Sequence, residues 1–429
     1  MKPIGIDLFA GAGGLSLGFE QAGFDVAAAV EIDPVHCAVH EYNFPHCEMI
    51  CQSVDRVTGE EIKTRSQLGD REIDVLFGGP PCQGFSLMGK RLLDDPRNTL
   101  VFHFIRLIQE LQPKYFVMEN VKGMAIGKHQ ELIGEVIEKI EYYDYDVVLP
   151  YQVLNAANYG VPQSRERLFL IGARRGLPLP KYPQPLTKPA KSKRKRDRIS
   201  DRLIDSPTVW DALQDLPNIE EYAELERRDW AIAELGTASP YAAKLRDSSI
   251  DPQDYSQPRE YDRHHLTASG RTRHTPKSIG RFAATPPGKT EPISRFLKLD
   301  PDGVCNTLRA GTPSSRGAFT SPRPIHPHHP RCITVREAAR LHSYPDWFRF
   351  HTTKWHGFRQ IGNSVPPWLG RSVAGEIMKV LEVTPSKPIA HIPLGDTELL
   401  SLTMAQAARH YGVAADVIPQ RSRQKEMTR

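Results

Sequence analysis

Cys82 is the residue whose surroundings most favour chemistry. It directly follows a run of turn formers, Gly78 to Pro81, and precedes the polar Gln83. The apolar stretch 73–77 ahead of that run is typical of a buried strand, so the thiol is expected just beyond a strand end. A free cysteine is most often a buried packing residue. Because packing requires neither flanking prolines nor polar neighbours, the pattern favours a nucleophile.

A carboxylate follows the next apolar stretch along the chain. Residues 115–118 read as a second buried strand, and Glu119 stands at its end. In an open α/β sheet, ligands collect outside the carboxyl ends of strands, so Cys82 and Glu119 are expected to face one pocket. A glutamate at a strand end is more often a solvated or capping residue. Its pairing with the thiol is what favours a catalytic role.

The first residues predict a nucleotide site. Residues 3–9 read as a strand that runs into the glycine-rich turn Gly11 to Gly14 and then into a helix. Glycines let a ligand approach the backbone at a helix N-terminus. Glu31 ends the next predicted strand, where a carboxylate suits a ribose diol. Ser16 stands where a nicotinamide-binding turn would have its third glycine, so the glycines alone do not decide which nucleotide binds.

Six motifs follow one another in the order found in cytosine-C5 DNA methyltransferases. They are Asp7 to Gly14, Pro80 to Gln83, Glu119 to Val121, Gln163 to Arg167, Arg336 to Arg340 and Gly362 to Val365. The chain therefore resembles this family of S-adenosylmethionine-dependent enzymes, in its prokaryotic restriction-modification form. The motifs span residues 7–365. They leave mainly the stretch 175–330 and the tail after about 383 without a counterpart.

The resemblance implies a covalent mechanism on a cytosine flipped out of duplex DNA. The Cys82 thiolate attacks C6, Glu119 binds or protonates N3, and Arg167 binds O2. C5 then takes the methyl group, and loss of the C5 proton with departure of the thiol leaves 5-methylcytosine. Arg165 and Arg167 are the cations expected to favour the thiolate. For Arg165, a solvated strand position or a phosphate contact is the alternative.

The resemblance also implies which residues hold S-adenosylmethionine. They are Phe9, Gly11, Gly13, Gly14, Leu15, Glu31, Ile32, Ser53, Val54, Asp55, Pro80, Asn363, Ser364 and Val365. The pair Ser53-Val54 departs from the Asp-Ile or Asp-Val usual in the family, so either Ser53 or Asp55 is expected to reach the adenine. Phe9 has the alternative of a core aromatic residue. Asn363 and Ser364 are expected to cap the helix 369–381, with or without a cofactor contact.

DNA contacts are expected from two regions. The first is the stretch 83–100, which acts as a closing loop in the family and supplies Gln83, Ser86, Lys90 and Arg97. The second is the segment 306–311, with Thr307 and Arg309, although Thr307 and Leu308 are as readily the start of a strand. The cationic run 188–198 is read equally as a solvated linker and as a phosphate-binding segment.

Length and motif order predict two lobes. Residues 1–174 alternate strand and helix, as expected for an α/β fold with a doubly wound, mostly parallel sheet, the Rossmann-like methyltransferase arrangement. Residues 175–330 predict a smaller, loop-rich DNA-recognition domain. The segment 331–382 is expected to return and complete the catalytic domain. Residues 383–429 form an extension that includes a short predicted helix, 403–411.

Composition fits an enzyme that meets a polyanion, because the net charge is +5 and the sequence pI about 8.8. No apolar run is long enough to cross a bilayer. Six cysteines in 429 residues favour a reducing compartment, so a cytoplasmic, nucleoid-associated enzyme is expected. The chain is expected to act as a monomer on double-stranded DNA, beside a cognate restriction endonuclease or other defence proteins.

Three further interpretations concern metals and rival functions. The cysteines and histidines between His36 and Cys51 crowd together but lack the paired spacing of a metal site, so no metal is expected. A tRNA cytosine-C5 methyltransferase would share the Cys82 and Glu119 motifs, but the long basic region after Arg167 favours duplex DNA. A catalytically silent DNA-binding regulator is disfavoured by the presence of Cys82, Glu119 and Arg167.

Overall fold

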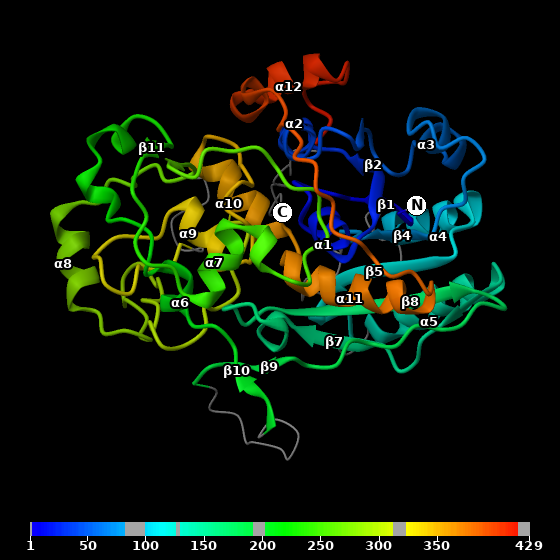
Figure 1. Cartoon of the computed structure of the whole chain (residues 1–429), viewed down its shortest axis with the longest axis horizontal. Coiled ribbons are helices and arrows are strands. Elements are labelled where there is room, and N and C mark those ends of the chain that lie inside the picture. The colour runs from blue at the N-terminus through cyan, green and yellow to red at the C-terminus, as the bar shows by residue number, and fades with distance from the viewer. Residues whose placement is uncertain (1, 82–98, 126–128, 192–201, 312–322, 419–429) are drawn as a thin grey trace, which may run out of the picture.

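The computed structural model of the chain describes residues 2–81, 99–125, 129–191, 202–311 and 323–418. Two lobes lie side by side. One is a sheet covered by helices, and the other consists of short helices and irregular chain (Figure 1). None of the helices in these residues is long and apolar enough to cross a membrane.

The first lobe is built on an eight-stranded sheet in the order β3-β2-β1-β4-β5-β8-β6, with β7 also paired to β8. The strands are β1 (Ile4–Leu8), β2 (Asp25–Glu31), β3 (Glu48–Cys51), β4 (Val75–Gly78), β5 (Tyr115–Val121), β6 (Tyr145–Val147), β7 (Gln152–Asn155) and β8 (Glu166–Arg174). The first five strands are parallel, whereas β8 runs antiparallel to β5, β6 and β7. The predicted doubly wound, mostly parallel sheet is confirmed.

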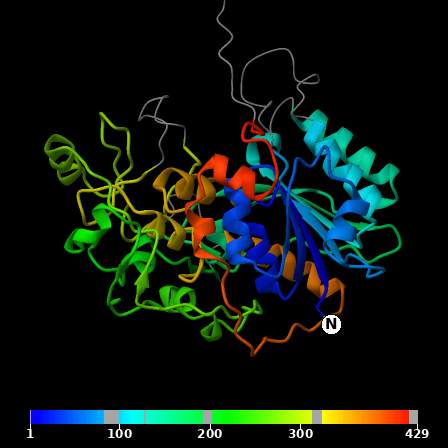
Figure 2. The same cartoon turned by 90° about the horizontal axis from the view of Figure 1, so that it is seen from above.

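Helices cover both faces of this sheet, as Figure 2 shows. They are α1 (Gly14–Ala22), α2 (Pro34–Asn43), α3 (Gly59–Arg65), α4 (Thr99–Leu111), α5 (His129–Tyr142) and α11 (Pro367–Val380). The strands alternate between two apolar layers. On β4, Phe77 packs in the layer that contains α1 and α11, and Leu76 packs in the layer that contains α3, α4 and α5. This two-residue period explains why the central strands read as continuous apolar runs.

The second lobe is rich in loops. Its helices are α6 (Val209–Leu213), α7 (Pro240–Arg246), α8 (Pro276–Ala284), α9 (Val335–Arg340) and α10 (Lys354–Asn363), and its small strand pair is β11 (Ala231–Ile232) with β12 (His265–Leu266). A second small pair, β9 (Thr187–Lys188) with β10 (Ile204–Asp205), is attached to the first lobe, where Thr187 bonds to Ala157 and Gly160. Helix α9 lies at the centre of the second lobe, where buried Arg340 pairs with Asp215 at 3.1 Å and Asp346 at 2.6 Å. Of the predicted return segment, α9 thus lies in the second lobe and α11 on the sheet.

The start of α11 differs from the prediction. Asn363 is the last residue of α10, and Ser364 is the C-cap of α10 rather than the N-cap of α11. Helix α11 begins at Pro367 after Pro366, without a side-chain cap. The predicted capping of α11 by Asn363 and Ser364 is therefore wrong. Proline at the first helical position has its φ already set for a helix and has no amide to be capped.

The C-terminal residues pack on the first lobe. The helical turn η10 (Thr397–Ser401) and helix α12 (Met404–His410) lie against α2 (Figures 1 and 2). A capping box between Thr403 and Gln406 starts α12, which confirms the predicted short helix. The tail therefore forms part of the folded protein up to residue 418.

Candidate active site

Glu119 and Arg167 form an ion pair where β5 and β8 lie side by side. In the antiparallel register Val121 lies opposite Arg167, and Glu119 lies opposite Phe169, so Glu119 and Arg167 are diagonal neighbours on one face. Nε of Arg167 is 2.7 Å from Oε1 of Glu119, and each side chain is 12% exposed.

Burial of this pair changes the pKa of its carboxyl group. It raises the pKa of Glu119, and the nearby guanidinium of Arg167 opposes the rise without cancelling it. A carboxyl with a raised pKa takes up a proton more readily than an ordinary glutamate. The pair can therefore present both a hydrogen-bond donor and a fixed cation to one substrate.

The turn that leads to Cys82 passes against this carboxylate. A Cβ on Gly79 would lie 2.7 Å from Oε2 of Glu119, so a larger residue would displace the carboxylate. Cys82 itself lies outside the described residues, as do Gln83, Ser86, Lys90 and Arg97. Because β4 is parallel to β5, with Gly78 paired to Met118, the chain enters the Cys82 segment from beside Glu119.

Asn120 has a role that sequence reasoning missed. Its Nδ2 donates a hydrogen bond to the carbonyl oxygen of Pro80 at 3.1 Å, and its Oδ1 accepts from the amide of Val121 at 2.8 Å. The side chain is buried. Asn120 thus holds the turn before Cys82 against the end of β5. Its place between Glu119 and Val121 in the acid motif was the available signal.

Arg165 lies fully inside the protein. Nη1 donates to the carbonyl of Leu308 at 2.7 Å, and Nη2 donates to those of Gly362 at 2.8 Å and Ser364 at 2.7 Å. Burial lowers the pKa of Arg165. The alternative of a solvated strand residue is therefore wrong. Every one of these bonds goes to a backbone carbonyl, so Arg165 joins the start of β8 to two distant segments.

A second buried pair, Gln163 and His342, reinforces this junction. Oε1 of Gln163 accepts from the amide of Leu308 at 3.1 Å, and Nε2 of Gln163 lies 2.9 Å from Nδ1 of His342. Nε2 of His342 lies 3.2 Å from the carbonyl oxygen of Ser364. Burial lowers the pKa of His342, which keeps the ring neutral. The sequence carries no local signal for this pair.

The two residues of segment 306–311 that are expected to read DNA, Thr307 and Arg309, differ in their surroundings. Oγ1 of Thr307 donates to the carbonyl of Ser164 at 2.7 Å, so this side chain joins the segment to the first lobe. Arg309 is exposed. The alternative that Thr307 and Leu308 begin a strand is wrong, because residues 306–311 form none.

Glu31 and the glycine turn form a cradle at the ends of β1 and β2. Oε2 of Glu31 accepts from the amide of Gly11 at 2.9 Å, and Oε1 accepts from the amide of Asp33 at 2.8 Å. A Cβ on Gly11, where φ is +57°, would meet nothing within 4 Å. The carboxylate is thus fixed with lone pairs to spare beside open space, which fits the ribose diol of a nucleoside. Ile32, beside it, is half-buried.

The glycine turn also contacts the last motif. A Cβ on Gly14 would lie 2.6 Å from the carbonyl oxygen of Val365 and 2.7 Å from Cβ of Ser364. Segments at opposite ends of the chain therefore meet here.

The other expected cofactor residues surround this junction or lie farther along the sheet. Leu15 and Pro80 are buried, Phe9 is half-buried and Asn363 is exposed, while Gly13 is the N-cap of α1.

The turn after β3 begins next to Glu31, since the amide of Gln52 donates to the Glu31 carbonyl at 2.9 Å. Val54 packs in the apolar layer, Ser53 is half-buried and Asp55 is exposed. The side chain of Ser53 is thus the more sheltered of the two adenine candidates.

A buried polar chain lies beneath the glycine turn. Oγ of Ser16 donates to Oδ2 of Asp7 at 2.6 Å and lies 3.0 Å from Nε2 of His40. Burial raises the pKa of Asp7 to about 8 and lowers that of His40 to about 3. Ser16 therefore connects β1 to α2, at the position where a nicotinamide-binding turn would have glycine.

The crowded cysteines lie in the core, as do His36 and His40, whereas His46 is exposed. Cys37, Cys47 and Cys51 are buried free thiols, and burial raises the pKa of Cys37 and of Cys47. Within the described residues, no group of three or more histidine, cysteine or acidic side chains is arranged to hold a metal.

Comparison with known proteins places this arrangement in a family. The family model for C-5 cytosine-specific DNA methylases matches residues 4–379. The Type II methyltransferase M.XorII of Xanthomonas oryzae pv. oryzae is 58% identical over 422 residues, covering 98% of this chain and 95% of that protein. M.DdeI of Desulfomicrobium norvegicum is 32% identical over 400 residues, covering 87% of this chain and 88% of that protein.

A solved structure supports the same family assignment. The crystal structure of an E. coli prophage-encoded DNA modification methyltransferase superposes with a TM-score of 0.71 at 36% identity, and the match covers 89% of this chain and 100% of that one. The chain therefore belongs to the C-5 cytosine-specific DNA methylases, enzymes that transfer a methyl group from S-adenosylmethionine to C5 of cytosine in DNA.

Proposed function

We propose that this enzyme methylates one cytosine within a specific duplex sequence, after flipping the base out and adding the Cys82 thiolate to its C6. The observation that carries the proposal is the Glu119–Arg167 ion pair, with Gly79 packed against its carboxylate on the way to Cys82. An acid and a cation are thereby held at the sheet edge toward which the chain runs before Cys82.

Cys82, Glu119 and Arg167 each have a separate role in the proposed reaction. Cys82 forms a bond to C6 and pushes electrons toward N3 and O2 of the ring. Glu119, whose raised pKa favours the protonated form, binds or protonates N3, and Arg167 binds O2. S-adenosylmethionine supplies the methyl group to C5. Loss of the C5 proton and breaking of the Cys82–C6 bond then restore the aromatic ring and the enzyme.

Arg165 acts differently from the role first expected of it. Its hydrogen bonds go to the carbonyls of Leu308, Gly362 and Ser364, so its direct part is to hold β8 against these segments. Its charge still opposes the rise in the pKa of Glu119. We therefore assign Arg165 as a positioning residue.

The cofactor is held at the cradle of the glycine turn. Glu31 binds the ribose diol, Ile32 packs on the adenine, and Ser53 is the better placed of the two candidates for its amino group. The remaining contacts come from Phe9, Gly11, Gly13, Gly14, Leu15, Val54, Pro80, Asn363, Ser364 and Val365. Support comes from the fixed Glu31 carboxylate and from the contact of Gly14 with Ser364 and Val365.

The second lobe, within residues 175–330, reads the target sequence. Arg309 is exposed next to the junction at Arg165, which supports a DNA contact. Thr307 acts through its bond to Ser164 rather than on a base. The loop residues Gln83, Ser86, Lys90 and Arg97 are expected to close over the DNA.

The biological role is protection of host DNA from a cognate restriction endonuclease or another defence nuclease. The support is the near full-length similarity to M.XorII, a Type II methyltransferase. The enzyme would work as a monomer on DNA, in the cytoplasm at the nucleoid.

Bisulfite sequencing of plasmid DNA from cells that express the chain tests this function, with Cys82→Ala as the control. Resistant cytosines at one short recurrent sequence, absent with Cys82→Ala, are expected. Complete conversion in both samples, with folded protein that binds S-adenosylmethionine, would overturn the DNA substrate and direct the same assay to tRNA.

A further inference from the structure

The described part of the C-terminal segment beyond the family match contacts both lobes. The match to the family model ends at residue 379. Residues 384–413, which come after the end of α11, are called the strap. They run from the end of α11 across the second lobe and on to α2, as Figures 1 and 2 show.

The strap is first attached to the second lobe. Nζ of Lys387 donates to the carbonyl of Asp251 at 2.5 Å. The amide of Ile392 donates to the Pro258 carbonyl at 2.9 Å, and the amide of Glu260 donates back to Ile392 at the same distance. These strand-like bonds fix the direction in which the strap leaves the lobe.

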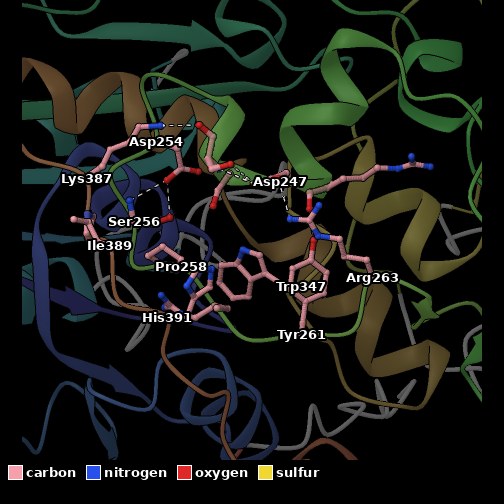
Figure 3. A pocket seen from close by; sticks show the side chains of 15 residues that line it. Asp247, Asp254, Ser256, Pro258, Tyr261, Arg263, Trp347, Lys387, Ile389 and His391 are labelled. Atoms are coloured by element: carbon pink, nitrogen blue, oxygen red, sulfur yellow. Dashed lines mark hydrogen bonds and ion pairs between the residues drawn. The ribbon is translucent and has the colours of Figure 1, made fainter.

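A cavity of about 320 Å³ marks this crossing (Figure 3). Lys387, Ile389 and His391 of the strap line it, together with Trp347 and ten of the residues between Arg246 and Arg263. None of the proposed catalytic or cofactor residues lines it. The strap is held here by hydrogen bonds, and its apolar anchorage lies farther on.

That anchorage joins the strap to the cofactor cradle. Leu399 and Leu400 of the strap form one buried cluster with Val39 and Tyr42 of α2 and with Ala12 of the glycine turn. Leu400 is 1% exposed, as is Ala12. The strap thus belongs to the same apolar cluster as the turn whose Gly11 amide donates to Glu31.

Polar bonds hold the strap to α2 on either side of this cluster. The amide of Gly395 donates to the Tyr42 carbonyl at 2.8 Å. Farther along, the hydroxyl of Tyr411 donates to Oε2 of Glu41 at 2.5 Å. Helix α2 follows Glu31 and Ile32 directly, so a shift of α2 would move the proposed ribose and adenine contacts.

The strap also reaches the approach to the last motif. The amide of Thr352 donates to the Leu400 carbonyl at 2.9 Å, and Nε2 of His351 lies 3.1 Å from the Leu402 carbonyl. These residues stand just before α10, which ends at Asn363 next to Ser364. The strap therefore bonds to two segments that adjoin proposed cofactor residues, and it shares an apolar cluster with the glycine turn.

We propose that the strap is a positioning element for S-adenosylmethionine binding, with Leu400 as its central residue. The inference rests on the cofactor site proposed above. By packing α2 against the glycine turn, the strap keeps Glu31, Ile32 and the turn in their binding arrangement before the cofactor arrives. A site that is ordered in advance does not lose affinity to the ordering of its own parts.

The test compares Leu400→Ala with the wild-type full chain by calorimetric titration of S-adenosylmethionine and by steady-state methylation of plasmid DNA. Loss of the apolar contact is expected to raise the Kd and the KM for the cofactor by about tenfold, a usual size for coupling between separate sites. The kcat at saturating cofactor is expected to change less than about twofold. Leu400→Met, which keeps the volume, should restore the Kd.

Two control variants separate this effect from general destabilisation. Ile140→Ala empties a fully buried position in the apolar layer on the other side of the sheet, and is expected to lower Tm without changing the cofactor Kd. Ile389→Ala alters a strap residue that is 91% exposed, and it should change neither Tm nor the cofactor Kd. If Leu400→Ala does not fold, Tyr411→Phe removes only one hydroxyl and should raise the Kd about threefold.

Failure of the strap proposal and failure of the cofactor site would give different results. A Leu400→Ala protein that loses Tm as Ile140→Ala does, yet binds the cofactor as the wild type does, would overturn the strap proposal and leave the cofactor site intact. Substitutions at Glu31 that leave cofactor binding unchanged in the wild-type background would overturn the cofactor site and the strap proposal with it.

Discussion

The side-chain amide of Asn120 donates to the carbonyl oxygen of Pro80 at 3.1 Å and so joins the end of β5 to the turn after β4. The two strands are parallel neighbours, and the residues that follow them carry the acid and the nucleophile. The distance between Glu119 and the Cys82 segment therefore depends on a side chain that takes no part in the chemistry.

Replacement of Asn120 by Asp should slow methyl transfer. The substitution keeps the shape of the side chain but replaces the donor with a second acceptor facing the Pro80 carbonyl. A displacement of about 1 Å in a reacting group can cost roughly 100-fold in rate. Single-turnover methylation of duplex DNA at saturating S-adenosylmethionine should show a loss of this size. A rate within about twofold of wild type would contradict the positioning role.

Gly79→Ala should impair catalysis more than stability. Its new Cβ would lie 2.7 Å from Oε2 of Glu119, so the carboxylate must move away from its bond with Arg167. Gly123→Ala is the matched control, because a Cβ there meets nothing within 4 Å. We expect kcat to fall at least about tenfold for Gly79→Ala and to remain near the wild-type value for Gly123→Ala. Equal kcat values for the two variants would show that the carboxylate has room to adjust.

Asp7 should make stability depend on pH. Its pKa is raised from 3.8 to about 8 by burial, so between these values the folded protein keeps a proton that the unfolded chain has lost. The free energy of unfolding should therefore fall as pH rises through this window, by up to about 1.4 kcal/mol per pH unit.

Asp7→Asn, which is neutral at every pH, should lack this contribution. Urea unfolding of both proteins at pH 6 and pH 8 measures it, since other titrating groups cancel in the difference. The variant should gain stability relative to wild type at the higher pH. Parallel pH profiles would mean that Asp7 is ionised in the folded protein.

Arg165→Lys should destabilise the junction between the lobes. A lysine has one ammonium group and cannot reach the carbonyls of Leu308, Gly362 and Ser364 together, so buried acceptors lose their donors. We expect a loss of roughly 3 kcal/mol in urea unfolding. Arg174→Lys, at the exposed end of β8 with its ion pair to Glu72, should cost less than about 1 kcal/mol. Similar losses for both would argue against the buried junction.

The sequence predicts well those features that depend on neighbouring residues. Apolar runs bounded by turn formers identify β4 and β5, and the motif order then brings Glu119 and Arg167 to one site. The glycine turn and Glu31 are recognised in the same way, because strand, turn and helix follow one another within a short stretch.

Features made by distant residues escape such reasoning. Gln163 and His342 are 179 positions apart, and nothing near either residue indicates that they pair. The cations, small residues and glycines around Thr307 predict a DNA contact, but they do not indicate the bond of its hydroxyl to the Ser164 carbonyl. Asn363 and Ser364 have good N-cap side chains, yet two prolines start the next helix without them. In the first two cases a partner distant in the sequence determines the contact, and in the third the prolines set where the helix starts.

The packing of α1 against α11 has a consequence for synthesis of the protein. The apolar face of α1 belongs to the layer completed by α11, a helix that starts at Pro367. At about 5–20 residues per second, the ribosome needs roughly 20–70 s to add the roughly 345 residues between the two helices. During that time α1 lacks its permanent cover, so folding of this lobe must wait until α11 has been synthesised.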